Sequence, residues 1–144
     1  MNAPILPYIK NFVVESKDNG ALTMTAGLDT KGYDFARFII CTGTVAVDFG
    51  TSPKITECDT VDGTYADITG ATQTVEAADD DGTWVIDIKL GGGRKRFLKP
   101  AATAGDGSGT ASEMAIICLL YKAETRANTY ADGGLAAAAD WVSV

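Results

Sequence analysis

The chain of 144 residues contains no histidine, and this absence limits the chemistry open to it. Ser-His-Asp and Cys-His nucleophiles are excluded, as is the side chain that most often transfers protons near neutral pH. The three cysteines, Cys41, Cys58 and Cys118, are scattered without a CxxC pair. That spacing does not fit a zinc site. We interpret them as small buried apolar side chains, with one disulfide or a reactive thiol as the alternative.

Basic residues and long apolar runs are also scarce. There are 12 Lys and Arg against 19 Asp and Glu, a net charge of -7, which disfavours a nucleic-acid partner. The longest apolar run, 114–121, is far shorter than the roughly 20 residues that span a bilayer. The sequence MNAPILPYIK has no basic segment followed by a long apolar stretch, so we expect neither a secretory signal nor a membrane partner. The expected place of synthesis is a cytoplasm.

Amphipathic helical patterns of ten residues are missing as well. Short β-forming runs and turns instead recur at the spacing that is typical of sandwiches and barrels. The sequence therefore predicts an all-β fold, a two-layer antiparallel β-sandwich of jelly-roll-like form. We expect an extended arm over 1–10, held by Pro4 and Pro7, a sandwich domain over 11–123 and an alanine-rich tail over 124–144.

Three segments give the clearest expectations for individual strands. Asn19-Gly20 is the strongest short-range hairpin signal in the chain. The run FARFIIC at 35–41 is apolar on most of both faces, which favours a central strand. TWVIDIKL at 83–90 alternates with a period of two and predicts a half-buried antiparallel strand with Trp84 facing the core.

The second half of the chain is harder to interpret. RFLK at 96–99 predicts a short strand ended by Pro100, followed by a loop of small residues up to 112. The run at 114–121 fits a helix or a strand, and its length favours a buried strand. The tail predicts either a short helical turn at 135–140 or an extended segment packed against another element.

Acidic pairs are the remaining candidates for chemistry. Glu57 with Asp59, and Asp79 with Asp81, resemble the carboxylate pairs of glycosidases but lie in turns or at strand ends. An EF-hand starting at Asp79 would need a glutamate where Leu90 stands. We therefore expect no enzyme activity, no metal and no cofactor.

The glycine-rich stretch GGGRKR at 91–96 does not have a Walker pattern. It predicts a turn followed by basic residues on an exposed edge. Such residues either dock an acidic neighbour or protect the edge from aggregation.

The segment KITECDTVDGTYADITGATQ at 54–73 carries a family resemblance. It resembles a pattern in small virion proteins of tailed bacteriophages. The matching elements are a strand ending in Glu57-Cys58-Asp59, an Asp-Gly turn, a Tyr-x-Asp-Ile strand and a Gly-Ala break. RKRFLK at 94–99, the following Gly/Ser/Thr loop and the apolar run after it extend the resemblance over roughly residues 35–122.

The resemblance implies a capsid decoration (cement) protein, a non-catalytic virion protein that binds the outside of the major capsid shell and stabilises it. The implied partners are the major capsid protein and other copies of the chain, as a homotrimer, and the implied location is the capsid surface. Alternatives are a tail-tube, head-tail connector or fibre-base protein, a carbohydrate- or ligand-binding module, and an enzyme. The candidate interface residues are Ile5, Leu6, Tyr8, Ile9, Arg94, Lys95 and Arg96.

Overall fold

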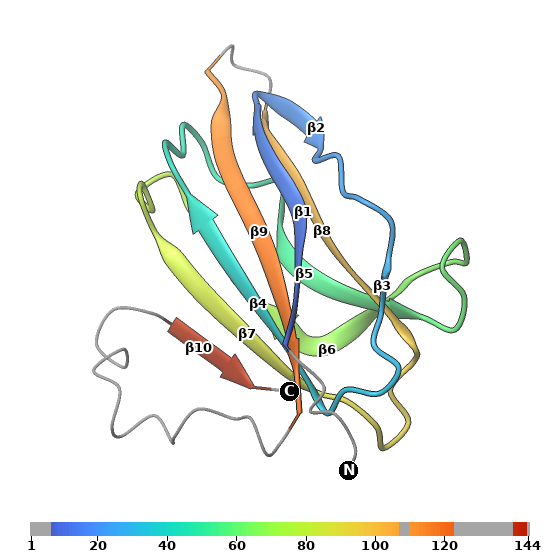
Figure 1. Ribbon diagram of the computed structural model, residues 1–144. Coiled ribbons are helices and arrows are strands. Elements are labelled where there is room, and N and C mark those ends of the chain that lie inside the picture. Colours follow the sequence, from blue (N-terminus) through green and yellow to red (C-terminus); the bar gives the residue numbers. More distant parts are fainter. Residues whose placement is uncertain (1–6, 107–109, 123–139, 144) are drawn as a thin grey trace, which may run out of the picture.

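The computed structural model describes residues 7–106, 110–122 and 140–143, and all regular elements in these ranges are β-strands (Figure 1). The strands are β1 (Tyr8–Lys17), β2 (Asn19–Ala21), β3 (Leu28–Asp29), β4 (Phe35–Thr42), β5 (Thr51–Cys58), β6 (Ala66–Thr72), β7 (Thr83–Lys89), β8 (Phe97–Asp106), β9 (Ser112–Tyr121) and β10 (Asp140–Ser143). The predicted all-β class is confirmed.

Two sheets pack face to face. Sheet A has the order β1-β9-β4-β7-β10, and sheet B has the order β2-β8-β5-β6, with β3 also paired to β8 (Figure 1). All pairs are antiparallel except β7 with β10. The strand pairs are nested in the sequence. The innermost pair is β5 with β6, and it is enclosed in turn by β4 with β7, by β2 and β3 with β8, and by β1 with β9. This connectivity is that of a jelly roll, so the predicted sandwich and its jelly-roll form are both confirmed.

The nesting is centred on the turn between β5 and β6. Partner residues lie at nearly equal sequence distances on either side of Asp62-Gly63: Glu57 pairs with Ala66, Phe35 with Lys89, Leu28 with Leu98 and Tyr8 with Leu120. The chain is therefore one long antiparallel ribbon, reversed at this turn and rolled into two sheets. A side chain at Gly63 would collide with Cys58 Sγ and Thr60 Oγ1, so close packing requires glycine in the turn.

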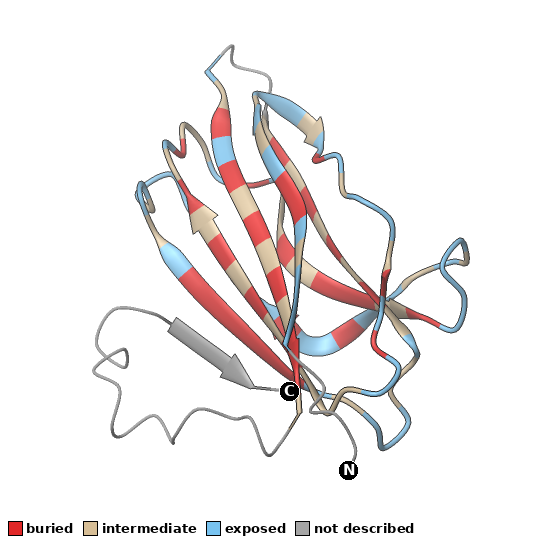
Figure 2. Cartoon of the chain, in the orientation of Figure 1, coloured by how far each residue is buried: buried red, intermediate tan, exposed pale blue. Residues whose placement is uncertain are grey.

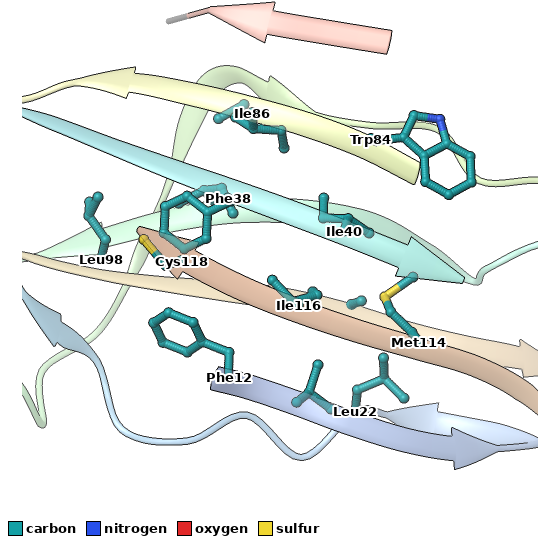
Figure 3. Packing of buried hydrophobic residues seen from close by; sticks show 14 of the residues in the cluster. Phe12, Leu22, Phe38, Ile40, Trp84, Ile86, Leu98, Met114, Ile116 and Cys118 are labelled. Atoms are coloured by element: carbon teal, nitrogen blue, oxygen red, sulfur yellow. The ribbon is translucent and has the colours of Figure 1, made fainter. Parts of the chain in front are cut away.

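The core lies between the sheets and follows the two-residue period of the strands. Figure 2 shows β4 and β9 banded, because alternate residues face inward. The inward side chains interlock in one cluster (Figure 3). Among the largest fully buried members are Phe12, Phe38, Ile40, Ile86, Leu98, Ile116 and Leu120.

A β-bulge in β1 decides which of its residues reach solvent. Asn11 pairs with Ile117 and Val13 with Ile116, so Phe12 is the extra residue. One extra residue reverses the side-chain alternation beyond it. Phe12 and Val13 are therefore both buried, whereas Val14 is 74% exposed.

The hairpin predicted at Asn19-Gly20 is wrong. β1 belongs to sheet A and pairs with β9, whereas β2 belongs to sheet B and pairs with β8. The chain passes from one sheet to the other here, and Gly20 has a positive φ of 90° next to a register shift in the β2–β8 pair. The Asn-Gly pair predicts a turn in the chain. It does not determine which strands the two flanking segments pair with, because those partners lie far away in the sequence.

The predicted end of a strand at Pro100 is also wrong, because β8 runs through it to Asp106. Pro100 is paired with Ile55 of β5 on one side. On the other side β3 pairs only as far as Leu98, and β2 pairs only from Thr103 onwards. Pro100 thus sits where β8 has a single strand neighbour, an edge-like position that tolerates a residue without an N–H group.

The boundaries of the arm and tail also differ from the sequence pattern. Residues 8–10 fall within the predicted arm but belong to β1, and Asp140–Ser143 of the predicted tail forms β10 along β7. The proposed helical turn at 135–140 lies almost entirely outside the described residues. The strand predicted at 83–90 is confirmed as β7, but it is buried on both faces rather than half-buried, since Val85 and Asp87 are buried too.

We predict that Trp84→Ala lowers the free energy of unfolding by about 3–5 kcal/mol, because a large side chain that is only 6% exposed leaves a cavity between the sheets. Urea denaturation followed by far-UV circular dichroism measures the loss. Val61→Ala, at a position 38% exposed, is the control and should change the free energy by no more than about 0.5 kcal/mol. A loss below about 1 kcal/mol for Trp84→Ala would contradict its place in the core.

Candidate interaction surface

The outer face of sheet A, which points away from sheet B, is largely aliphatic. Its cross-strand rows follow from the register: Ile9, Leu119, Arg37 and Asp87; Asn11, Ile117, Ile39 and Val85; Val14, Ala115, Cys41 and Thr83. The β4 and β9 members of these rows are half-buried, although they face away from the core. Antiparallel sandwiches usually have polar residues on such a face, so this surface is suited to being covered.

The outer face of sheet B has the expected polar character. Lys54 forms a 2.7 Å ion pair with Asp67 across β5 and β6, and the ammonium of Lys99 lies 5.8 Å from the ring centroid of Tyr65. A hollow of about 370 Å³ on this side has Lys54, Lys99, Thr51 and Thr103 in its lining. The contrast between the two faces makes sheet A the candidate interaction surface.

One ion pair crosses this aliphatic face. Arg37 donates from Nε to Asp87 Oδ1 at 2.8 Å and from Nη2 to Oδ2 at 2.7 Å. The guanidinium carbon also lies 5.6 Å from the ring centroid of Tyr121, which stacks on Phe35. The two-point contact satisfies the buried carboxylate of Asp87 and fixes the side chain of Arg37 across β4 and β7.

A hollow of about 360 Å³ opens on the same face, where β1, β9 and β4 lie side by side. Its apolar part consists of Val14, Cys41 and Ala115, which share one cross-strand row. Glu15 and Glu113 form the acidic part of its lining. We call this feature the sheet A hollow.

Local contacts hold the acidic residues of the sheet A hollow in place. Glu15 accepts a hydrogen bond from the backbone N–H of Thr23 at 2.7 Å. The carboxylate of Glu113 accepts from the N–H of Thr44 at 3.4 Å. It lies over Gly43, where any side chain would collide with it. The hollow thus combines an aliphatic floor with two positioned carboxylates.

Sequence reasoning did not single out Val14, Glu113 or Ala115. Cys41 was interpreted as a small buried side chain, whereas it is partly exposed in the hollow. The only available signal was that 35–41 and 114–121 are apolar at almost all positions, which implies a second apolar face. The bulge at Phe12 hides the contribution of Val14, because simple alternation along β1 gives it the wrong face.

The predicted interface residues at the start of the chain fall into two groups. Ile5 and Leu6 lie outside the described residues. Tyr8 and Ile9 are 48% and 65% exposed at the beginning of β1. Next to them, Lys10 donates from Nζ to the carbonyl oxygen of Ala26 at 2.6 Å. We call Tyr8, Ile9 and Lys10 the β1 corner.

The predicted basic cluster is matched to acidic residues within the chain. Arg94 lies 3.5 Å from Glu57, Lys95 lies 3.2 Å from Asp59, and Arg96 lies 2.6 Å from Asp29, all measured nitrogen to oxygen. Two of these partners, Glu57 and Asp59, belong to the end of β5 and the turn that follows it. The cluster therefore connects the central turn to the β7–β8 loop, and an acidic partner would have to compete with these contacts.

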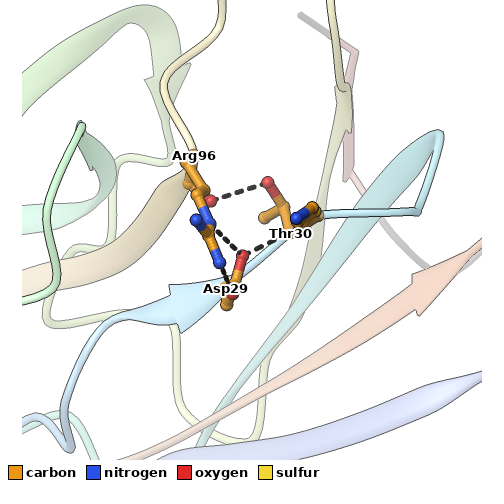
Figure 4. A network of polar contacts seen from close by, with 4 residues as sticks. Asp29, Thr30 and Arg96 are labelled. Carbon is orange, nitrogen blue, oxygen red and sulfur yellow. Dashed lines mark hydrogen bonds and ion pairs between the residues drawn. The ribbon is translucent and has the colours of Figure 1, made fainter.

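Asp29 and Arg96 form the best-aligned of these pairs (Figure 4). Arg96 donates from Nε at 2.9 Å and from Nη2 at 2.6 Å to the two carboxylate oxygens of Asp29. Thr30 Oγ1 donates to the carbonyl oxygen of Arg96 at 2.7 Å. The pKa of Asp29 is lowered from 3.8 to about 2, mainly by the hydrogen bonds from Arg96. Burial acts in the opposite direction, and the N–H of Lys31 lowers the pKa further.

The acidic turn before β7 has a structural explanation. Asp79 accepts from the N–H of Glu76 at 2.8 Å, and Asp80 accepts from the N–H of Val45 at 2.6 Å. Asp81 has a φ of 55°, in the left-handed region that aspartate tolerates better than most residues. Across the described ranges, no group of three or more acidic or cysteine side chains is placed to hold a metal ion.

All three cysteines are free thiols. Cys58 and Cys118 are buried, and burial raises the pKa of the Cys118 thiol well above its usual range. Cys41 is partly exposed in the sheet A hollow. The disulfide alternative is therefore not realised.

Comparison with known proteins identifies no relative. No protein-family model matches the chain, and neither a curated protein nor a solved structure matches it. Within the described ranges, no helix is long and apolar enough to cross a membrane. A functional proposal therefore depends on the surfaces described above and on the resemblance carried by residues 35–122.

We predict that Arg96→Ala raises the pKa of Asp29 from about 2 towards 3.8, because the substitution removes both hydrogen bonds to the carboxylate. Carboxyl-carbon NMR as a function of pH measures it. Lys95→Ala is the control, since Lys95 contacts Asp59 instead.

The same pair gives a pH dependence with a defined direction. Because the pKa of Asp29 is lower in the folded chain, its contribution to stability is complete above about pH 4 and is lost as the pH falls towards 2. Arg96→Ala should reduce the loss of unfolding free energy that occurs as the pH falls from about 4 towards 2. An unchanged pKa of Asp29 in that variant would contradict the assignment.

Proposed function

We propose that this protein is a non-catalytic structural component of a tailed-bacteriophage virion, a decoration protein that binds the outside of the major capsid shell and stabilises it. The proposal includes self-association, as a homotrimer at the capsid surface, after synthesis in the host cytoplasm. Its main support is one observation, the largely aliphatic outer face of sheet A on a jelly-roll sandwich, on which Val14 and Ile9 are exposed.

The physical reasoning starts from this surface. Covering it would remove the exposed side chain of Val14 and its half-buried neighbours from water, and burial of apolar area drives most protein association. A protein that binds only the assembled shell shifts the equilibrium towards assembly by mass action. Such a mechanism needs complementary surfaces and no reactive group.

The chemistry of the surface also distinguishes this proposal from a sugar-binding module. Jelly rolls occur in both capsid and lectin domains, so the fold alone does not decide between them. Sugar sites present aromatic rings together with convergent polar groups. The most exposed large apolar side chains on sheet A, Val14 and Ile9, are aliphatic, and Trp84 is buried in the core. Tyr8, at 48% exposure, is the exposed aromatic side chain on the described strands of this sheet.

The direct test is co-sedimentation with capsids assembled from the major capsid protein encoded in the same genome. We predict saturable binding and a higher temperature of capsid disruption when the protein is bound. Binding to tail tubes or baseplates instead of capsids would favour the other virion locations, and binding to none of them would reject the proposal.

We further predict that removing residues 1–6 weakens capsid binding while leaving the melting temperature of the isolated protein nearly unchanged. The reason is that β1 begins at Tyr8, so the truncation retains all of the described strands. A matched truncation that also removes residues 8–10 should lower the melting temperature, because these residues pair with β9. Equal capsid occupancy with and without residues 1–6 would contradict a role for the arm.

A further inference from the structure

We propose that the sheet A hollow binds the β1 corner of a second copy of this chain. This inference goes beyond the proposed function, because it names the contact between copies and concerns the protein in the absence of capsids. Both halves of the contact are described above: the hollow contains Val14, Cys41, Ala115, Glu15 and Glu113, and the corner consists of Tyr8, Ile9 and Lys10.

Both halves are apolar at their centre. The hollow has an aliphatic floor, and its volume of about 360 Å³ is at the lower end of the range for binding pockets. The corner presents Ile9 at 65% exposure and Tyr8 at 48% exposure. Inserting Ile9 into the hollow would cover the exposed side chains of Ile9 and Val14 at once.

The charges of the two halves are also complementary. Lys10 donates to the carbonyl oxygen of Ala26, and its ammonium lies 5.2 Å from the ring centroid of Phe12, so neither contact supplies a carboxylate to balance its charge. Glu113 accepts from a backbone N–H and has no ion pair with a described residue. In a chain with a net charge of -7, copies repel one another unless a cation of one meets an acid of the other. Lys10 opposite Glu113 provides that pairing, whereas Glu15 already has an ion pair with Lys17 of its own chain at 3.9 Å.

The corner cannot fill the hollow of its own chain. Ile9 and Val14 lie on the same strand, roughly 15 Å apart at the rise of an extended chain. Pairing with β9 over the length of β1 fixes this separation. A β1 corner that fills the hollow must therefore come from another copy. Because corner and hollow are different surfaces, the contact is head-to-tail and can close into a ring, which fits the proposed trimer.

A native cysteine in the hollow allows a direct test. In Ile9→Cys, the new thiol of one copy should lie near Cys41 of another, and the other two cysteines are buried. We expect mild oxidation with diamide to give disulfide-linked oligomers of the isolated protein on non-reducing gels. The double variant Ile9→Cys with Cys41→Ser should abolish them. Val61→Cys, at an exposed site in the β5–β6 turn, should not give Cys41-dependent linkage.

The pattern of linked species identifies the assembly. A ladder that ends at three supports the closed ring, and one that ends at two supports a reciprocal pair that uses the same contact. Absence of Cys41-dependent linkage overturns the proposal. Since no capsid is present, this result is independent of whether capsid binding is observed.

Sedimentation velocity gives a second measurement without oxidation. Val14→Asp places a third carboxylate in the hollow and should shift the protein to monomer at micromolar concentration, whereas Val61→Asp should sediment like the unmodified protein. Circular dichroism melts would show that both variants are folded. An unmodified protein that is monomeric, or a Val14→Asp variant with unchanged association, would contradict the proposal.

Discussion

The whole fold depends on the reversal of the chain between β5 and β6. The nested pairs β4 with β7, β3 with β8 and β1 with β9 all lie at nearly equal sequence distances on either side of Asp62-Gly63, so their pairing is centred on this turn. The ion pairs of Arg94 with Glu57 and of Lys95 with Asp59 connect the same turn to the loop that enters β8. The acids and bases that looked like possible catalytic or docking groups in the sequence thus hold the centre of the ribbon together.

Local patterns predicted the parts of the fold that depend on near neighbours. The alternation around Trp84, the apolar run at 114–121 and the central hairpin all became strands, although β7 is buried on both faces rather than half-buried. The errors at Asn19-Gly20 and at Pro100 have a common cause. Whether a hairpin forms at Asn19-Gly20, and whether the strand continues through Pro100, depends on which strand lies alongside. In both cases that neighbouring strand is far away in the sequence.

The interaction surface was less accessible to sequence reasoning than the fold. Tyr8 and Ile9 were identified because they follow two prolines in an apolar segment. Val14 and Ala115 become neighbours only after the bulge at Phe12 sets the register of β1 on β9. The contacts of Arg96 with Asp29 span 67 positions in the sequence, so the basic segment looked unpaired until the topology was known.

The nesting also bears on how the chain is made. The first strand of sheet A pairs with β9, near the other end of the sequence, so sheet A cannot close until residue 121 has left the ribosome. Until then, the apolar faces of β1 and β4 lack a central partner, and a ribbon with such distant pairings forms slowly because its loops must close first. The β5–β6 hairpin is the one pair available early and is the natural starting point for the rest. A newly synthesised chain is therefore expected to expose the apolar faces of β1 and β4 until β9 has been made.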